Sequence, residues 1–235
     1  MGLSTVTKYS FSWAFSARRI LFTISPSLVR KIRYSTHIVK YLTMIIPPIY
    51  GTCNQQDFYI YAACDTKYFD EFGPAFIHSI KQNTTAGIHV HLFNPKQSQI
   101  DYCTKNNVSV TWETAPLDLF NLASQTQLSD DELNRTRNAM KKGYDKDLLE
   151  RIQKTYYACA RFIRLAELFN NVTVLELDID AVVRKEIPRL TEHDFYIHHI
   201  TGKKARFLAG GLYLNARPLT TQFLLEYANQ LRSFI

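Results

Sequence analysis

The spacing of apolar and polar residues changes several times along the chain, and the order of these changes predicts the fold class. Short apolar or alternating runs predict strands, whereas apolar residues three and four positions apart predict helices. The predicted strands are 58–63, 87–93, 108–112, 172–177, 195–198 and 207–214. The predicted helices are 70–82, 97–105, 147–169 and one from 218 to the chain end, and 65–68 is predicted to be a loop. This order predicts an α/β domain with a largely parallel sheet.

One long polar segment interrupts the pattern. Residues 113–146 have no apolar period, and we expect a long loop with short helical pieces around 130–140. Loops of this length in compact domains often act as lids or binding loops. A variable surface insertion is the alternative.

Two aspartates directly follow the predicted strand 172–177. In an extended backbone, residues two apart point to the same side, so Asp178 and Asp180 are expected to present both carboxylates to one point. Two such carboxylates repel each other, and a hard cation such as Mg²⁺ or Mn²⁺ removes the repulsion. Ligands of open α/β sheets bind outside the carboxyl ends of the strands. The pattern therefore predicts a metal site, although aspartates also simply cap backbone N–H groups.

The positive charge of the chain is concentrated at one end. Residues 1–56 contain seven Lys or Arg and no Asp or Glu, while the other 21 basic residues are balanced by all 21 acidic ones. The main domain is thus not basic, and we expect no nucleic-acid partner. We expect 1–56 to be a disordered or partly helical extension. Organelle targeting and contact with a membrane surface are alternatives to a cytoplasmic location.

Four segments, taken in order, resemble motifs of the GT-A nucleotide-sugar glycosyltransferases. They are Tyr59–Tyr68, Tyr157–Phe169, Val174–Val183 and Phe207–Asn215. The resemblance covers about 57–220 and is strongest to the glycogenin-like group, glycosyltransferase family 8. It implies a GT-A fold, which is a Rossmann-like, mostly parallel sheet flanked by helices, over residues 57–235.

The resemblance also implies roles for individual residues. The residues that would contact the nucleoside are Ala62, Ala63, Asp65 and Tyr68. The catalytic residues would be Arg161, which contacts the diphosphate and sugar, and the metal-binding pair Asp178 and Asp180. The small residues that let the backbone approach the sugar or acceptor would be Ala209, Gly210 and Gly211.

Most of these roles have a purely structural alternative. Asp65 is also suited to capping a turn, Tyr68 to a place in the core, and Arg161 to a solvated helix face. Gly210 and Gly211 also suit a β-bulge. Two further candidate metal ligands, which are more often structural, are His198 and His199.

The function implied is transfer of a hexosyl group from a nucleotide-diphospho-sugar, expected to be a UDP-sugar, with Mn²⁺ or Mg²⁺. The acceptor is an unknown glycan, lipid or protein. The chain departs from the family at Leu208, where an Asn is usual, and it ends at Ile235 before the His-x-x-Gly-x-x-Lys-type motif that supplies a further metal ligand. We therefore expect a domain without the usual C-terminal part. A catalytically inactive or truncated nucleotide-sugar-binding module is the alternative.

Overall fold

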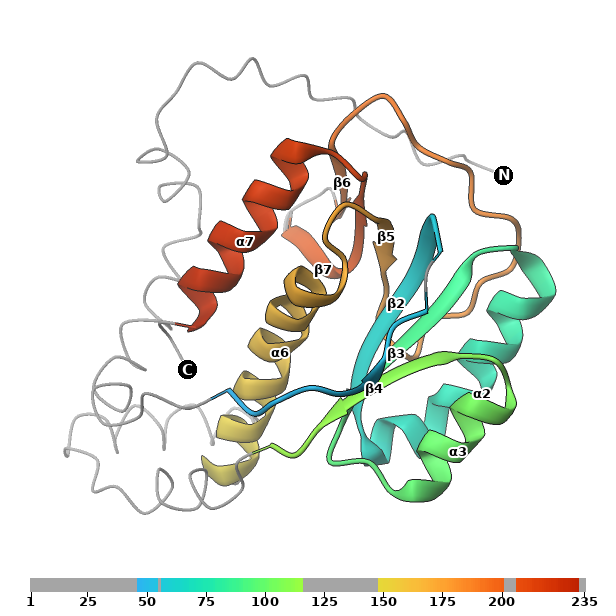
Figure 1. The fold of residues 1–235 in the computed structure, drawn as a ribbon, viewed down its shortest axis with the longest axis vertical. Coiled ribbons are helices and arrows are strands. Elements are labelled where there is room, and N and C mark those ends of the chain that lie inside the picture. Colours follow the sequence, from blue (N-terminus) through green and yellow to red (C-terminus); the bar gives the residue numbers. More distant parts are fainter. Residues whose placement is uncertain (1–45, 55, 116–147, 201–205, 233–235) are drawn as a thin grey trace. The chain divides into compact units, whose positions relative to one another are not determined.

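The computed structural model describes residues 46–54, 56–115, 148–200 and 206–232, all within one compact unit. Seven strands and four helices occur in this part of the chain (Figure 1). The strands are β1 (Tyr50–Thr52), β2 (Phe58–Asp65), β3 (Gly87–Phe93), β4 (Ser109–Glu113), β5 (Thr173–Glu176), β6 (Phe195–Ile200) and β7 (Arg206–Leu214). The helices are α2 (Thr66–Asn83), α3 (Gln97–Lys105), α6 (Leu148–Leu168) and α7 (Pro218–Arg232). The α/β class predicted from the sequence is confirmed.

All seven strands form one sheet in the order β1-β4-β3-β2-β5-β7-β6. The four central strands run parallel to one another, whereas β1, β7 and β6 each pair antiparallel. The expectation of a mostly parallel sheet thus holds for the centre, and the sheet as a whole is mixed. The chain moves outward from β2 through β3 to β4 and then returns to the other side of β2 as β5. This reversal makes the gap between β2 and β5 the topological switch point, where open α/β sheets bind ligands.

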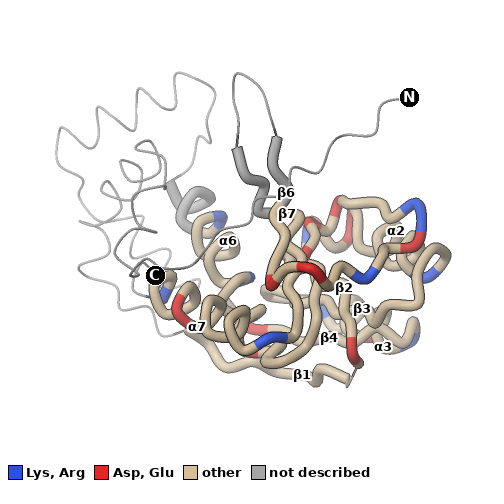
Figure 2. The backbone as a smooth tube through the Cα atoms, turned by 90° about the horizontal axis from the view of Figure 1, so that it is seen from above, with Lys and Arg blue, Asp and Glu red and all other residues tan. Residues whose placement is uncertain are grey.

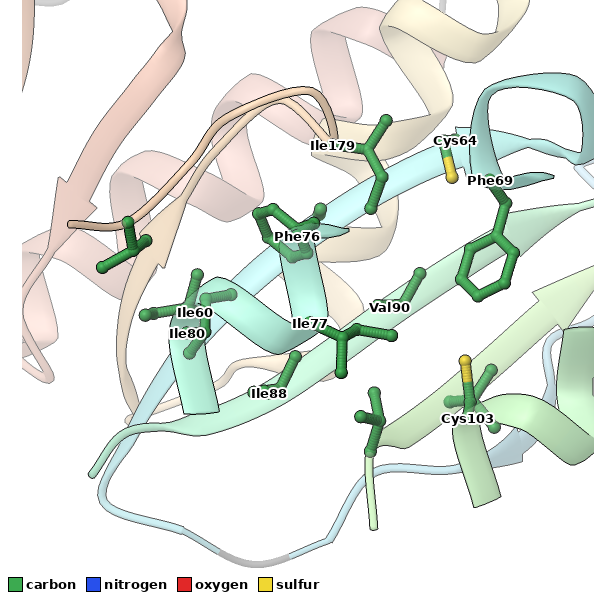
Figure 3. Packing of buried hydrophobic residues seen from close by; sticks show 14 of the residues in the cluster. Ile60, Cys64, Phe69, Phe76, Ile77, Ile80, Ile88, Val90, Cys103 and Ile179 are labelled. Atoms are coloured by element: carbon green, nitrogen blue, oxygen red, sulfur yellow. The ribbon is translucent and has the colours of Figure 1, made fainter. Parts of the chain in front are cut away.

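Helices cover both faces of the sheet. On one face α2 and α3 pack on a cluster that includes Ile60, Phe76 and Ile80 (Figure 3). On the other face α6 and α7 pack on a cluster that includes Tyr61 and Ile163. Alternate residues of the central strands face these two clusters, as the period of a strand requires.

Two local features differ from the sequence prediction. Residues 65–68 are not a loop, because Asp65 is the N-cap of α2 and its Oδ1 accepts a hydrogen bond from the backbone N–H of Tyr68 at 2.9 Å. The capping alternative for Asp65 is thereby confirmed. The short edge strand β1 was not predicted, and it lies in the segment assigned to the N-terminal extension. The long segment 116–147 and residues 1–45 lie outside the described part.

A polar layer is buried beneath α6. The ring nitrogens of His89 contact Ser109 Oγ at 2.8 Å and Thr111 Oγ1 at 2.9 Å. Two residues after Thr111 in β4, Glu113 Oε2 accepts a hydrogen bond from Arg164 Nε at 2.5 Å. Charged positions elsewhere are mixed in sign along the described chain (Figure 2). No helix in the described ranges is long and apolar enough to cross a membrane.

The buried histidine predicts a specific acid sensitivity. Burial, helped by neighbouring His91, lowers the pKa of His89 to about 3. Below a pH of about 6.5 the unfolded chain therefore takes up a proton that the folded chain refuses, and stability falls by ~1.4 kcal/mol per pH unit from this group. We expect His89→Gln to remove that slope, so that its stability approaches that of the wild type as pH falls. Urea unfolding at several pH values measures this, and equal slopes for both proteins would contradict it.

Candidate functional site

The carboxyl ends of β2 and β5 meet at the switch point of the sheet. β5 ends at Glu176, and the next backbone N–H, of Leu177, still donates to the Tyr61 carbonyl of β2 at 2.9 Å. On its other side β5 pairs with β7, where Glu176 lies opposite Leu212. Extending this antiparallel register by two residues places Asp178 beside Gly210. Asp178 therefore lies just beyond the carboxyl end of β5, with β2 on one side and β7 on the other.

Glu176 and Asp178 are the carboxylates that share one face of the strand. Both reach the α6 side, since both lie close to Arg161, whereas Ile179 is 4% exposed and points into the cluster under α2 (Figure 3). The backbone then turns, because the Ala181 N–H donates to the Asp178 carbonyl at 3.0 Å. The extended geometry assumed for Asp178 and Asp180 is thus not present. The two carboxylates that do lie two residues apart on the same side of the strand are those of Glu176 and Asp178.

Arg161 of α6 is the cation of this cluster. Its Nη1 lies 2.6 Å from Asp178 Oδ1 and 3.4 Å from Glu176 Oε1. The hydroxyl of Tyr61 donates to the Arg161 backbone carbonyl at 3.0 Å, and the guanidinium lies 4.8 Å from the ring centre of Phe162. With 17% of its side chain exposed, Arg161 is not the solvated residue of the alternative interpretation.

The two carboxyl groups differ sharply in environment. The Asp178 side chain is 53% exposed, whereas that of Glu176 is fully buried. Burial raises the pKa of Glu176 to about 8, although the charge of Arg161 acts in the opposite direction. Burial alone would lower the pKa of Arg161, but Glu176 and then Asp178 outweigh it and raise the pKa. The guanidinium therefore stays charged.

Gly210 makes room for the Asp178 carboxylate. A Cβ atom at this position would overlap Oδ2 and Cγ of Asp178, and even Oδ1 would be only 2.9 Å away. Side chains essentially never approach so closely, so a larger residue at 210 would displace Asp178. Gly210 was expected to let the backbone approach a ligand, and in the structure it makes room for a carboxylate of the chain itself. The β6–β7 register also shifts between Ile197 and His199, opposite this run, which supports the bulge alternative.

The nucleoside-contact candidates are divided between the core and the edge. Tyr68 is 47% exposed and lies 5.9 Å from the Phe72 ring, so the alternative that placed Tyr68 in the core is wrong. Ala63 is half-buried, and Ala62 is fully buried in the α2 cluster, so its side chain is not open to a ligand. Asp65 lies at the end of β2 with one oxygen used for capping.

Some expected site residues lie outside the described side chains. These are Ala209, His198 and His199. Within the part that is described, no group of three or more His, Cys, Asp or Glu side chains is arranged to hold a metal ion. Asp178 and Asp180 are both exposed, and Mg²⁺ often takes only one or two carboxylates when substrate phosphates complete its shell. Either exposed aspartate alone could therefore contribute to the shell of a cation that arrives with a phosphate ligand.

No family model matches the sequence, and neither a curated protein nor a solved structure matches it. The side-chain cluster at the switch point and the motif resemblance are therefore the two features that bear on function.

Glu176 is the site residue that sequence reasoning missed. It occupies an inward position of an apolar strand, two residues after buried Val174 and two before Asp178. An acidic residue at such a position is unusual because burial disfavours its charge. That mismatch between residue type and period is the signal that identifies it.

Proposed function

We propose that this chain is a GT-A-type glycosyltransferase that binds a nucleoside diphosphate sugar at the edge between β2 and β5. The observation that carries the proposal is the ion pair between Arg161 and Asp178 at the switch point. An arginine with unused donors beside exposed carboxylates suits a phosphate group and its counter-cation together. The resemblance of four ordered motifs supports the same class.

The arrangement of the sheet also supports the proposal. The first strand of the parallel centre, β2, ends beside β5, and Tyr68 is exposed in the first turn of α2, the helix that follows β2. A nucleoside at the end of β2 would lie within reach of Tyr68 for stacking, with its diphosphate toward Arg161. Asp65 would face the ribose end of such a ligand.

Each residue of the cluster would have a separate task. Arg161 would donate hydrogen bonds to the diphosphate and stabilise the negative charge that grows as the sugar departs. Asp178 and Asp180 would hold Mn²⁺ or Mg²⁺, which when bound neutralises the diphosphate and orients it. Gly210 would keep the space that Asp178 needs.

Calorimetry with UDP tests the proposal. We expect Mn²⁺ to tighten UDP binding in the wild-type chain, and Asp178→Asn and Asp180→Asn each to reduce that gain by about 10–100-fold. Asp101→Asn is the matched control, because Asp101 is an exposed aspartate of α3 whose carboxylate accepts a hydrogen bond from Gln97 of the same helix. Equal UDP binding with and without Mn²⁺ would contradict the metal site.

A donor-hydrolysis screen then separates the two functional alternatives. The wild-type chain is incubated with several UDP-sugars and Mn²⁺, and free sugar is measured. We expect slow hydrolysis of at least one donor that Asp178→Asn abolishes. Tight, Mn²⁺-dependent binding without turnover of any donor would favour the catalytically inactive nucleotide-sugar-binding module.

A further inference from the structure

Glu176 is a buried carboxyl group whose hydrogen bonds are incomplete among the described residues. Its side chain is fully buried, and among the described residues the polar groups next to its carboxyl oxygens are the Arg161 guanidinium and the backbone N–H of Gly211, neither of them at regular hydrogen-bond geometry. A buried polar group without such partners is unfavourable by roughly 1–3 kcal/mol. An apolar residue of similar size would suit the strand better. A role of Glu176 in holding the neighbouring Arg161 in place would account for this cost.

That neighbour is Arg161, which has donors to spare. A guanidinium carries five N–H donors, and here Nη1 donates to Asp178 while the buried Nε has no partner among the described residues. Arg161 thus contacts one carboxyl group that is buried and one that is half-exposed. Only Asp178, whose side chain is half-exposed, can move away from Arg161 into solvent.

We propose that Glu176 is a positioning residue that anchors Arg161 from within the sheet, while Asp178 is a temporary partner that a diphosphate replaces on the guanidinium. This inference rests on the proposed function, since it assigns the same edge to an anionic ligand. When the anion arrives, Asp178 is released toward solvent, and Glu176 keeps the arginine at the carboxyl end of β5.

The two carboxyl groups must then affect anion binding in opposite directions. A negative charge on either carboxyl group would repel an arriving anion, so a purely electrostatic view expects the loss of either one to leave anion binding unchanged or to strengthen it. In the proposed arrangement, losing Asp178 removes a competitor, whereas losing Glu176 releases the anchor. The sign of the Glu176 effect is therefore the decisive observation.

The experiment uses the full chain without metal, in the presence of a chelator. Inorganic pyrophosphate, UDP and uridine are titrated by calorimetry. We expect Asp178→Asn to bind pyrophosphate and UDP about tenfold more tightly and Glu176→Met to bind them about tenfold more weakly. Uridine binding should not change, because uridine carries no phosphate.

Two further variants separate positioning from folding. Glu176→Met should unfold at the same or a higher urea concentration than the wild type, because an unsatisfied buried carboxyl is replaced by an apolar side chain. Glu176→Gln keeps one oxygen that can accept from Arg161 and should recover part of the lost affinity. Glu226→Met, on the exposed side of α7 where Glu226 accepts a hydrogen bond from Gln222, should leave anion binding unchanged.

The outcomes distinguish the inference from the proposed function. Weaker pyrophosphate and UDP binding by Glu176→Met supports both. Glu176-dependent binding of pyrophosphate without any binding of UDP supports the anchor and overturns the proposed function. Unchanged or tighter anion binding by Glu176→Met overturns the anchor and leaves the proposed function standing. A wild-type chain that binds neither anion overturns both.

Discussion

Glu113→Ala is expected to lower the free energy of unfolding by about 3–5 kcal/mol. Glu113 is fully buried at the end of β4, where it accepts hydrogen bonds from Arg164 and from the Tyr156 hydroxyl. Burial would raise the pKa of Glu113, but His91 and the charge of Arg164 outweigh burial and lower that pKa. Removing the carboxylate leaves a charged arginine that is 3% exposed without its main counter-ion. Urea unfolding followed by circular dichroism measures the loss.

A paired replacement distinguishes the lost ion pair from a simple cavity. Replacing both Glu113 and Arg164 by Met removes both charges and restores apolar packing, so most of the stability should return. The Arg164 side chain also donates to Glu167 and to the Pro47 carbonyl, which limits the recovery. Glu186→Ala, at an exposed position, is the control for a lost glutamate. A loss below about 1 kcal/mol for Glu113→Ala would show that the pair is not a stabilising contact.

The elements predicted best from the sequence are those in which both the apolar period and the residues that end the element are clear. Strand 87–93 and helix 97–105 match β3 and α3 at both ends, because the turn at Asn94-Pro95 separates two clear periods. The start of α2 was missed because Asp65 is both the last residue of β2 and the cap of the helix. The strand β1 has only three residues and depends on β4, 58 to 62 residues further along the chain, for its pairing. Such long-range pairing leaves no local pattern.

Strand direction was equally invisible in the sequence. β6 and β7 alternate like any other strands, and only their pairing with β5 makes them antiparallel. The same limit applied to the site. The resemblance pointed to Arg161 and Asp178, which the structure brings together at 2.6 Å. It did not point to Glu176, because whether an acidic residue lies near an arginine 15 positions earlier depends on how α6 crosses the sheet.

Gly210→Ala is expected to reduce the Mn²⁺-dependent gain in UDP binding by about 10–100-fold, as much as loss of Asp178 itself. The added methyl group would occupy the space of the Asp178 carboxylate, so the carboxylate must leave its place beside Arg161. Overpacking of this kind also costs about 1–3 kcal/mol of stability. Calorimetry with UDP and Mn²⁺ gives the binding effect, and urea unfolding confirms that the variant is folded under those conditions.

A double-mutant cycle shows whether the glycine acts through the aspartate. In an Asp178→Ala background the space beside residue 210 is no longer needed, so Gly210→Ala should change neither UDP binding nor stability further. Additive losses would instead mean that Gly210 serves the sheet or the ligand directly, as its place beside the β6–β7 irregularity allows. The coupling between these two residues therefore decides whether the small residue in β7 exists to admit a substrate or to admit Asp178. Strong coupling would mean that Gly210 serves to accommodate the Asp178 carboxylate. If Gly210 only let the backbone approach a sugar, the effect of Gly210→Ala on UDP binding would be the same with and without the Asp178 side chain.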